Sequence, residues 1–196
     1  MKNLARKSLV AVGLMMSLST LANESELRIK DREKSVTSIS FENVVQGSSL
    51  TIKDKNGLVL YNESIEQSGD YTKGFDLTSL PDGDYFFELN SELKIVVVPF
   101  NVGSREVVFD KASEESIYKP VVRSKDNLVY VSRTAIDHTP LSYKIYYADT
   151  YDLVHTANFE ELEEVKKIYD FSGAKKGNYV FVFESKGRKF TKNVKI

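Results

Sequence analysis

The sequence predicts an all-β fold with two tandem β-sandwich domains that follow a signal peptide. Three observations support this prediction. One motif occurs twice, short runs of alternating apolar and polar residues are separated by turn-forming residues, and a short apolar segment follows a basic N-terminus. Alternation is the period of a strand that buries one face, and a basic start before an apolar run is typical of an export leader.

The repeated motif occupies residues 75–89 and 169–183, which align without gaps 94 residues apart. Each copy begins with an aromatic residue, Asp and an apolar residue, continues through a polar turn to Gly-x-Tyr, and ends in alternating apolar residues. Several residue classes match at one offset, so we interpret the motif as a hairpin of two strands in each copy of a duplicated domain. Chance similarity between two amphipathic hairpins is the alternative.

The Gly-x-Tyr step of each copy, at Tyr85 and Tyr179, precedes an apolar residue by two positions. This order resembles the start of strand F in immunoglobulin-like sandwiches, where a corner tyrosine donates its hydroxyl to the upstream backbone. The resemblance implies a structural corner role for both tyrosines and buried positions for Phe87 and Phe181. We therefore expect two immunoglobulin-like or fibronectin III-like sandwiches, at residues 23–112 and 113–196.

The N-terminus has the pattern of a leader. Lys2, Arg6 and Lys7 precede an apolar stretch at residues 8–21, and a small-x-small cleavage pattern ends at Ala22. We predict a signal peptide at residues 1–22 and a periplasmic or extracellular mature protein. An uncleaved anchor is the alternative, although the run is shorter than the ~20 residues of a membrane span.

Charge and cysteine content restrict the classes of partner. The formal net charge is −1, and removal of the three basic leader residues makes the mature chain mildly acidic. Nucleic-acid-binding proteins usually present a basic face, so we expect no nucleic-acid partner. The chain has no cysteine, which excludes a disulfide and a lipid-modified cysteine.

The first domain reads as a series of short strands. Asn56-Gly57 separates two apolar runs and predicts a hairpin with a type I′ turn, in which both central residues have positive φ. The polar composition of residues 67–73 predicts a loop. The expected strands are 36–45, 50–53, 58–61, the motif hairpin at 75–89, 93–102 and 105–109.

Residues 95–100, Ile-Val-Val-Val-Pro-Phe, are apolar on both faces of a strand. We interpret them as a last strand buried between the sheet and the neighbouring domain. Exposure for pairing with another chain is the alternative. Pro99 lacks an N–H and therefore requires an edge or a bulge at that point.

The second domain follows the polar residues 110–115 and repeats the order of the first. Residues 160–167 are rich in charge and predict a loop, with a helical turn capped by Asn158 as the alternative. The expected strands are 117–123, 128–131, 141–147, 152–159, the motif hairpin at 169–183, and 190–196.

Catalytic and metal-binding patterns are weak. His138 lies in an expected turn and His155 in an expected strand, without the spacing of zinc ligands. No Gly-x-Ser-x-Gly nucleophile motif occurs, so we predict no catalytic, cofactor-binding or metal-binding residues and no enzyme. Asp82 and Asp84 could contribute to a weak calcium site, but a solvated turn is favoured.

One pair of tyrosines has the character of a surface contact. Alternation in residues 141–147 turns Tyr146 outward, and Tyr151 follows in the next turn. Aromatic residues of this kind are enriched at interfaces. We name Tyr146 and Tyr151 as possible contacts for an envelope protein or a glycan.

Two stretches together resemble a known family. Residues 52–60 contain Asp-Lys-Asn-Gly before an apolar strand, and residues 75–87 contain Asp-Leu-x-x-Leu-x-x-Gly-x-Tyr. This order is similar to the C-terminal sorting domain of the type IX secretion system of Bacteroidota. Residues 187–196 are similar to the basic last strand of such domains. The resemblance implies a seven-stranded immunoglobulin-like sandwich, and the internal copy is the better match.

These features together predict a non-catalytic secreted or periplasmic binding or scaffold protein built from two β-sandwich modules. Two alternatives stay open. The chain could be a type IX secretion substrate with a C-terminal sorting-like domain, or a carbohydrate-binding module. No cofactor is expected in any of these roles.

Overall fold

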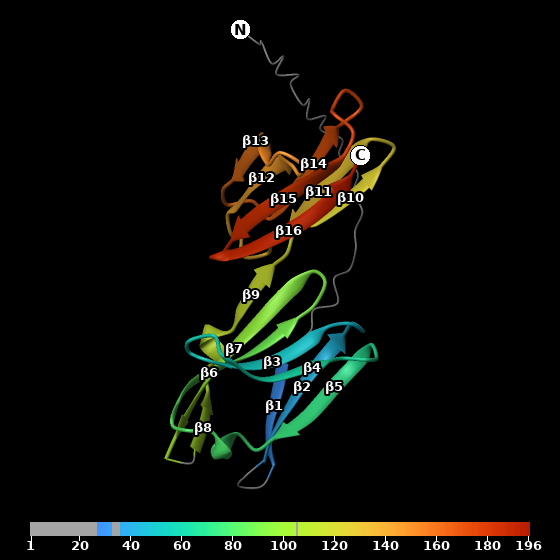
Figure 1. The fold of residues 1–196 in the computed structure, drawn as a ribbon. Helices are drawn as coiled ribbons and strands as arrows, with labels where there is room; N and C mark the ends of the chain where they lie inside the picture. The colour runs from blue at the N-terminus through green and yellow to red at the C-terminus, as the bar shows by residue number, and fades with distance from the viewer. Residues whose placement is uncertain (1–26, 33–35, 105) are drawn as a thin grey trace. The chain divides into compact units, whose positions relative to one another are not determined.

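The computed structural model describes residues 27–32, 36–104 and 106–196 (Figure 1). The predicted signal peptide at residues 1–22 lies outside the described residues. Over the described ranges the chain forms β-strands and two short 3-10 turns, without an α-helix. The prediction of an all-β fold is therefore confirmed. Within the same ranges, no helix is long and apolar enough to cross a membrane.

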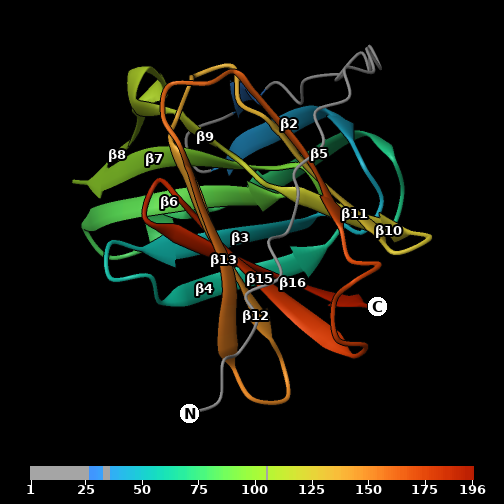
Figure 2. The same ribbon diagram turned by 90° about the horizontal axis from the view of Figure 1, so that it is seen from above.

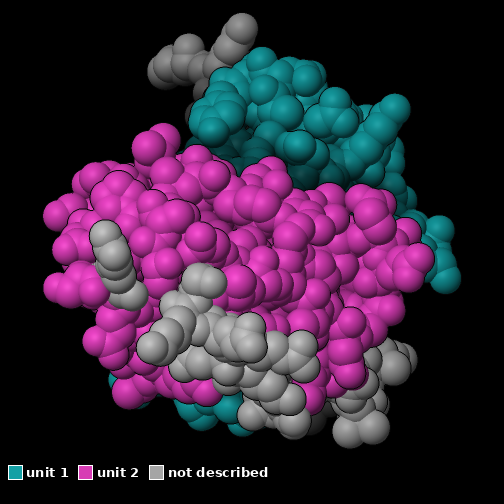
Figure 3. Space-filling view, turned by 90° about the horizontal axis from the view of Figure 1, so that it is seen from below, with its two compact units in different colours: residues 1–17, 117–196 teal, residues 18–116 magenta. Residues whose placement is uncertain are grey.

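The chain divides into two compact units between Ser116 and Ile117 (Figure 3). We call the described residues up to Ser116 the first sandwich and Ile117–Ile196 the second sandwich. The sequence placed the division four residues earlier, after Ala112, in the same polar segment. Each sandwich has its own core, and no residue is shared between the two.

The first sandwich consists of a three-stranded and a larger sheet, all antiparallel. The smaller sheet has the order β1-β2-β5 and the larger one the order β4-β3-β6-β7-β8. The strands are β1 (Leu27–Arg32), β2 (Val36–Val44), β3 (Ser49–Asp54), β4 (Val59–Ser64), β5 (Gly69–Phe75), β6 (Gly83–Asn90), β7 (Lys94–Gly103) and β8 (Glu106–Phe109).

The second sandwich repeats this arrangement with the orders β10-β11-β14 and β13-β12-β15-β16. The short strand β9 (Glu115–Tyr118) spans the division at Ser116 and pairs with β7. The strands are β10 (Val121–Lys125), β11 (Leu128–Thr134), β12 (Leu141–Tyr147), β13 (Asp152–Phe159), β14 (Glu164–Asp170), β15 (Asn178–Ser185) and β16 (Arg188–Lys195).

The two sandwiches share one strand topology. Read in order, β10 to β16 correspond to β1 to β7, and the fourth strand of each set pairs with the third. In constant-type immunoglobulin domains the fourth strand instead joins the first sheet. The division into three and four strands is thus fibronectin III-like, as Figure 2 shows for β3, β4, β6 and β7 side by side. Registers agree too, because Ile52 lies opposite Phe87 and Ile145 lies opposite Phe181.

Aromatic rings fill both cores. Phe87 is fully buried, with its ring centroid 5.0 Å from that of Phe100. Phe181 is equally buried in the second sandwich. In that core the hydroxyls of Tyr143 and Tyr169 share a hydrogen bond of 2.6 Å, so both polar ends are satisfied away from water. Burying one such ring stabilises the fold by about 1.5–3 kcal/mol.

The repeated motif is not a hairpin, and this prediction was wrong. Phe75 ends β5 and Gly83 begins β6, and these strands belong to different sheets. The connection contains a 3-10 turn at Leu77–Ser79 whose Leu77 is buried in the core. Phe171 is buried between β14 and β15 in the same way. The connection buries an apolar residue in the core. The chain therefore crosses to the other sheet instead of turning back along its own sheet.

Two predicted loops are strands. Residues 67–73 contribute most of β5, and residues 160–167 contribute the first half of β14, so the helical-turn alternative is wrong as well. β5 pairs with β2 and β14 pairs with β11. Both strands have few apolar side chains facing the core, because most of their residues face water. Pairing with an apolar neighbouring strand places these residues in a sheet, so their own polar composition does not predict a strand.

The Asp54–Gly57 turn joins β3 to β4 as predicted, but its type differs. Only Gly57 has positive φ, at 84°. The N–H of Gly57 donates to the Asp54 carbonyl at 2.9 Å, which describes a type I turn followed by a left-handed glycine. The Asp54 carboxylate accepts the backbone N–H groups of Asn56 and Leu58 at 2.9 and 2.8 Å. These bonds favour the type I form over the predicted type I′ form.

The apolar strand β7 is an interior strand rather than the last one, because β8 pairs with it beyond β6. Val96, Val98 and Phe100 are buried in the core of the first sandwich, so this face is not exposed for another chain. Pro99 lies next to the point at which β8 pairing ends at Phe100. Its missing N–H therefore costs no sheet hydrogen bond on that side.

Candidate functional site

The two tyrosines that the sequence singled out lie together at the β12–β13 hairpin. Tyr146 lies on β12 opposite a bulge in β13, where Val154 is skipped in the register, and Tyr151 lies in the turn that leads to β13. Their ring centroids are 4.6 Å apart and the rings are inclined by 18°. Tyr151 is 63% exposed, so the outer ring of this stack is available to a partner.

Apolar neighbours extend this stack on the outer face of the sheet. Tyr146 lies opposite Leu153 on β13 and opposite Val180 on β15. Leu153 is 56% exposed. We call Tyr146, Tyr151 and Leu153 the tyrosine platform. Exposed aromatic and aliphatic side chains on a rigid sheet are the composition of an interface centre.

Backbone strain accompanies the platform. Tyr151 has φ of 57°, in the left-handed region that a bulky residue rarely occupies. Such a conformation costs ~1–3 kcal/mol, and strain of this kind clusters at functional sites. The stack with Tyr146 contributes about 0.5–1.5 kcal/mol and offsets part of this cost. A glycine would fit this turn without the strain.

The corner tyrosines make identical contacts in the two sandwiches. The hydroxyl of Tyr85 donates to the Pro81 carbonyl at 2.7 Å, and that of Tyr179 donates to the Lys175 carbonyl at 2.7 Å. Both rings are buried, and burial raises the pKa of Tyr179. Each tyrosine thus ties the sheet-crossing connection to the strand that follows, which is a structural role.

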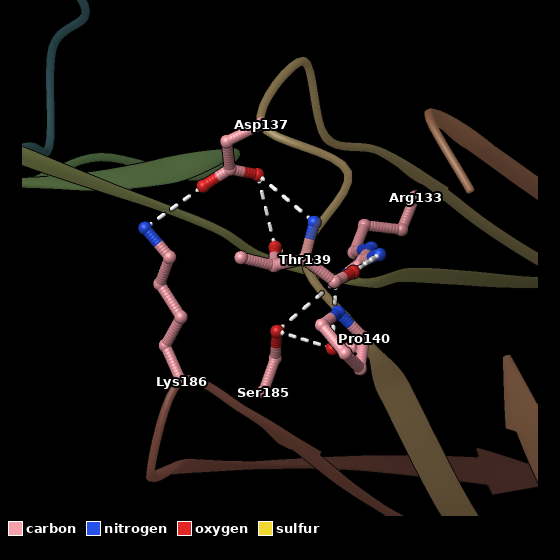
Figure 4. Close-up of polar contacts among 6 residues, drawn as sticks. All are labelled: Arg133, Asp137, Thr139, Pro140, Ser185 and Lys186. Carbon is pink, nitrogen blue, oxygen red and sulfur yellow. Dashed lines mark hydrogen bonds and ion pairs between the residues drawn. The ribbon is translucent and has the colours of Figure 1, made fainter. Parts of the chain in front are cut away.

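A buried arginine closes one end of the second sandwich (Figure 4). Arg133 is 2% exposed and extends from β11 toward residues of the other sheet. Its guanidinium donates to the carbonyls of Thr139 and Pro140 and to Ser185 Oγ, the last at 3.0 Å. Its Nε has no hydrogen-bond partner. Burial lowers the pKa of Arg133, while the charge of Asp137 acts in the opposite direction.

An ion pair lies beside this arginine. Lys186 Nζ is 2.8 Å from the Asp137 carboxylate, which also accepts the backbone N–H and hydroxyl of Thr139. Burial acts to raise the pKa of Asp137, but these hydrogen bonds outweigh it and hold the pKa below its ordinary value. The network joins the loop before β12 to the β15–β16 turn, so it stabilises this end of the sandwich.

A hollow of about 580 Å³ adjoins the same end. Asn158, Ser142, Glu184 and Lys189 form one row of its lining, across β13, β12, β15 and β16. Lys189 lies 3.1 Å from Glu184, so the charges in this row largely compensate each other. Glu160, Lys186 and Arg188 also line the hollow, so its lining contains two acidic and three basic side chains.

The remaining candidates have local roles. His138 has φ of 54° in its turn, and His155 packs its ring 5.1 Å from that of Tyr169, where burial lowers its pKa. Asp84 accepts the side-chain amide of Asn101 at 2.8 Å, and Asp82 accepts the backbone N–H of Ser104 at 3.4 Å. Over the described ranges, no three acidic, histidine or cysteine side chains come together as metal ligands.

Sequence reasoning missed Arg133 and Ser185, although the signal was present. Val129 and Val131 alternate into the core, and Arg133 occupies the next inward position on β11. Ser185 continues the inward series of Phe181 and Phe183 in the same way. A polar residue in an inward register predicts a buried hydrogen-bond network.

Fold and surface define a class of protein, namely a tandem pair of fibronectin III-like sandwiches with an exposed aromatic platform on the second. Residues 33–99 match the family model described as the secretion system C-terminal sorting domain. The match lies in the first sandwich, and it confirms the resemblance and the prediction that the internal copy is the better match. On this match, the chain is a secreted β-domain protein.

The similarity of this chain to other known proteins is low. Among curated proteins, none matches the chain. The human OSCAR ligand-binding domain matches at 8% identity over 88% of this chain and 97% of its own, with a TM-score of 0.27. The chicken CNTN1 FN1–FN3 domains match at 10% identity over 82% of this chain and 60% of their own, with a TM-score of 0.29.

Proposed function

We propose that the protein is a non-catalytic secreted binding protein and that the tyrosine platform is its contact surface. The observation that carries this proposal is the stack of the exposed Tyr151 on the half-buried Tyr146, which is held in place at the cost of backbone strain. Partners consistent with an aromatic platform are an envelope protein or a glycan. We place the protein at the cell surface or outside the cell rather than in the periplasm, because the matched family is a sorting domain.

Substitution of the outer ring separates binding from folding. Tyr151→Gly removes the exposed ring and also relieves the left-handed strain, so the free energy of unfolding should fall by no more than about 1 kcal/mol. Binding to an envelope protein fraction or to a glycan array should weaken by about tenfold or more. Urea unfolding and surface plasmon resonance measure the two effects on one preparation.

Tyr130→Ala is the matched control. Tyr130 is 38% exposed on β11, in the other sheet of the same sandwich, and lies outside the platform. Its loss should leave binding unchanged. Equal affinities for wild type and Tyr151→Gly would contradict the proposal, and selective loss of binding to one partner class would identify that class.

The family match favours a second candidate function, export by a type IX secretion system. Deleting residues 186–196 is not a clean test, because it removes all of β16 and the buried Val194. Fractionation of cells with and without a functional type IX translocon is better. The intact chain should accumulate inside the envelope when the translocon is inactive. The same location in both strains would exclude this route.

A further inference from the structure

The outer edge of β16 differs from the corresponding edge in the first sandwich. Tyr85 lies opposite Phe100 and Tyr179 lies opposite Val194, so β7 and β16 are equivalent strands. β7 has β8 on its far side, whereas β16 is the last strand of its sheet among the described residues. β10, in the other sheet, comes near β16 but does not pair with it.

The register shows which backbone groups face this edge. Gly177 and Ile196 each donate a backbone N–H to the other's carbonyl, at 3.1 and 2.9 Å. Hydrogen-bonded pairs alternate along an antiparallel ladder, and the β15–β16 register runs without a shift. The N–H and C=O groups that point away from β15 are therefore those of Lys189, Thr191, Asn193 and Lys195.

Two of the features that usually protect a sheet edge, a bulge and a proline, are missing at β16, whereas a third, lysine side chains, is present. The β3–β4 and β12–β13 pairs contain bulges at the opposite edges of their sheets, and the β15–β16 pair does not. Pro99 of β7 corresponds to Asn193 of β16, so an outward N–H exists here where the first sandwich lacks one. A regular eight-residue edge of this kind can accept another strand.

Charge indicates the chemistry of that strand. β16 contains Arg188, Lys189, Lys192 and Lys195 and no acidic residue. In the first sandwich, the strand on the equivalent edge begins with Glu106 and is followed by Asp110. The chain thus contains its own example of an acidic and apolar strand, Glu-Val-Val-Phe-Asp, on this edge of this fold.

We propose that the outer edge of β16 binds an extended, acidic segment of a partner protein, which pairs with it as an added strand. Main-chain hydrogen bonds supply affinity in this mode, and flanking side chains supply specificity. Lys195 at one end of the edge selects acidic residues, while Lys189 at the other end already pairs with Glu184. This proposal is independent of the tyrosine platform, which lies on the opposite, β12–β13 side of the same sheet.

The test uses the full chain and two short synthetic peptides in which valine alternates with glutamate or with lysine. The glutamate peptide should bind at least about tenfold more tightly than the lysine peptide, and this preference should decrease with salt. On binding, amide hydrogen exchange should slow at Thr191 and Asn193, whose N–H groups face the edge, and not at their neighbours that already bond to β15. N-methylation of alternate peptide nitrogens should abolish binding.

Two variants complete the test. Lys189→Glu with Lys195→Glu should weaken binding of the glutamate peptide by about tenfold, and Lys144→Glu on β12 of the same sheet should not. Thr191→Pro removes one outward N–H and should also prevent binding, with folding checked by circular dichroism. Equal affinity for both peptides, no binding of either, unchanged binding by the charge-reversal variant, or a dimer of the chain that pairs through β16 would overturn the proposal.

Discussion

Tyr85 and Tyr179 make the same hydrogen bond at the same place in the two sandwiches. Tyr85→Phe and Tyr179→Phe keep the buried ring but leave the Pro81 or Lys175 carbonyl without its donor. Each should reduce the free energy of unfolding by about 0.5–1.5 kcal/mol, which urea denaturation can measure. Tyr130→Phe is the control, because Tyr130 is exposed. No change for either corner variant would show that water replaces the bond.

Arg133 carries the largest predicted effect of a single polar side chain. Arg133→Met keeps part of the buried volume but leaves the carbonyls of Thr139 and Pro140 and the hydroxyl of Ser185 with fewer donors. We expect a loss of about 2–4 kcal/mol in the second sandwich, measured by thermal and urea unfolding. Ser185→Ala should cost less, since it removes one of these bonds. A stable Arg133→Met variant would contradict this account.

Residue-level predictions differed in success for physical reasons. The corner positions follow from a local order, Gly-x-Tyr, and the structure places both hydroxyls against the upstream backbone. The position of Tyr151 against Tyr146 depends on a bulge and on a left-handed backbone conformation, and the local composition predicts neither of these features. The sequence therefore indicates Tyr146 and Tyr151 as a pair but does not predict their stacked geometry.

One cluster joins the two sheets of the first sandwich at the strands β4 and β5. The Glu63 carboxylate accepts hydrogen bonds from Tyr61, Tyr71 and Lys73. The hydrogen bond from Lys73, followed by that from Tyr61, lowers the pKa of Glu63 to about 2. In the second sandwich Ala157 takes the place of Glu63, because Ala157 lies opposite Tyr143 as Glu63 lies opposite Leu50, so this clamp belongs to one copy only.

The pH dependence of the first sandwich follows from this cluster. The folded-state pKa of Glu63, about 2, lies below the ordinary value of 4.5. Its stabilisation is therefore present above pH 4.5 and is lost as pH falls toward 2. Wild type should have a higher melting temperature than Glu63→Gln at neutral pH, and this difference in melting temperature should vanish near pH 2. A pH-independent difference would assign the effect to packing instead.

At the scale of elements, the strands with clear alternation were predictable and the polar ones were not. β12 and β15 alternate between buried and exposed residues along their whole length. β5 and β14 depend on β2 and β11, which are distant in sequence, for their place in a sheet. Long-range pairing determines these strands, so a window of sequence around them predicts a loop.

The separate cores suggest that each sandwich can fold alone. No buried residue belongs to both clusters, and the second cluster lies wholly within β10 to β16 and their connections. Residues 117–196 expressed alone should give a dispersed amide NMR spectrum and cooperative unfolding, with a single transition. A collapsed spectrum without dispersion would show that this sandwich requires the preceding residues.

The class of fold could be predicted from the sequence, but the connectivity of the strands between the two sheets could not. Alternation and the duplicated motif indicated two sandwiches, because one buried face per strand is a local property. The crossing of residues 75–89 from one sheet to the other was missed, since the local pattern of a hairpin and of a sheet-crossing connection is the same. Burial of Leu77 decides between them, and burial is a property of the folded chain.

The hydrogen-bonded hydroxyls of Tyr143 and Tyr169 give the second sandwich an optical label. The chain contains no tryptophan, so its near-ultraviolet absorbance comes mainly from 11 tyrosines. Burial raises the pKa of both residues of this pair, so they resist ionisation in alkali for as long as the core around them is closed. Burial also raises the pKa of Tyr71 in the first sandwich, so phenolate absorbance that appears late in an alkaline titration reports the opening of both cores without any added dye.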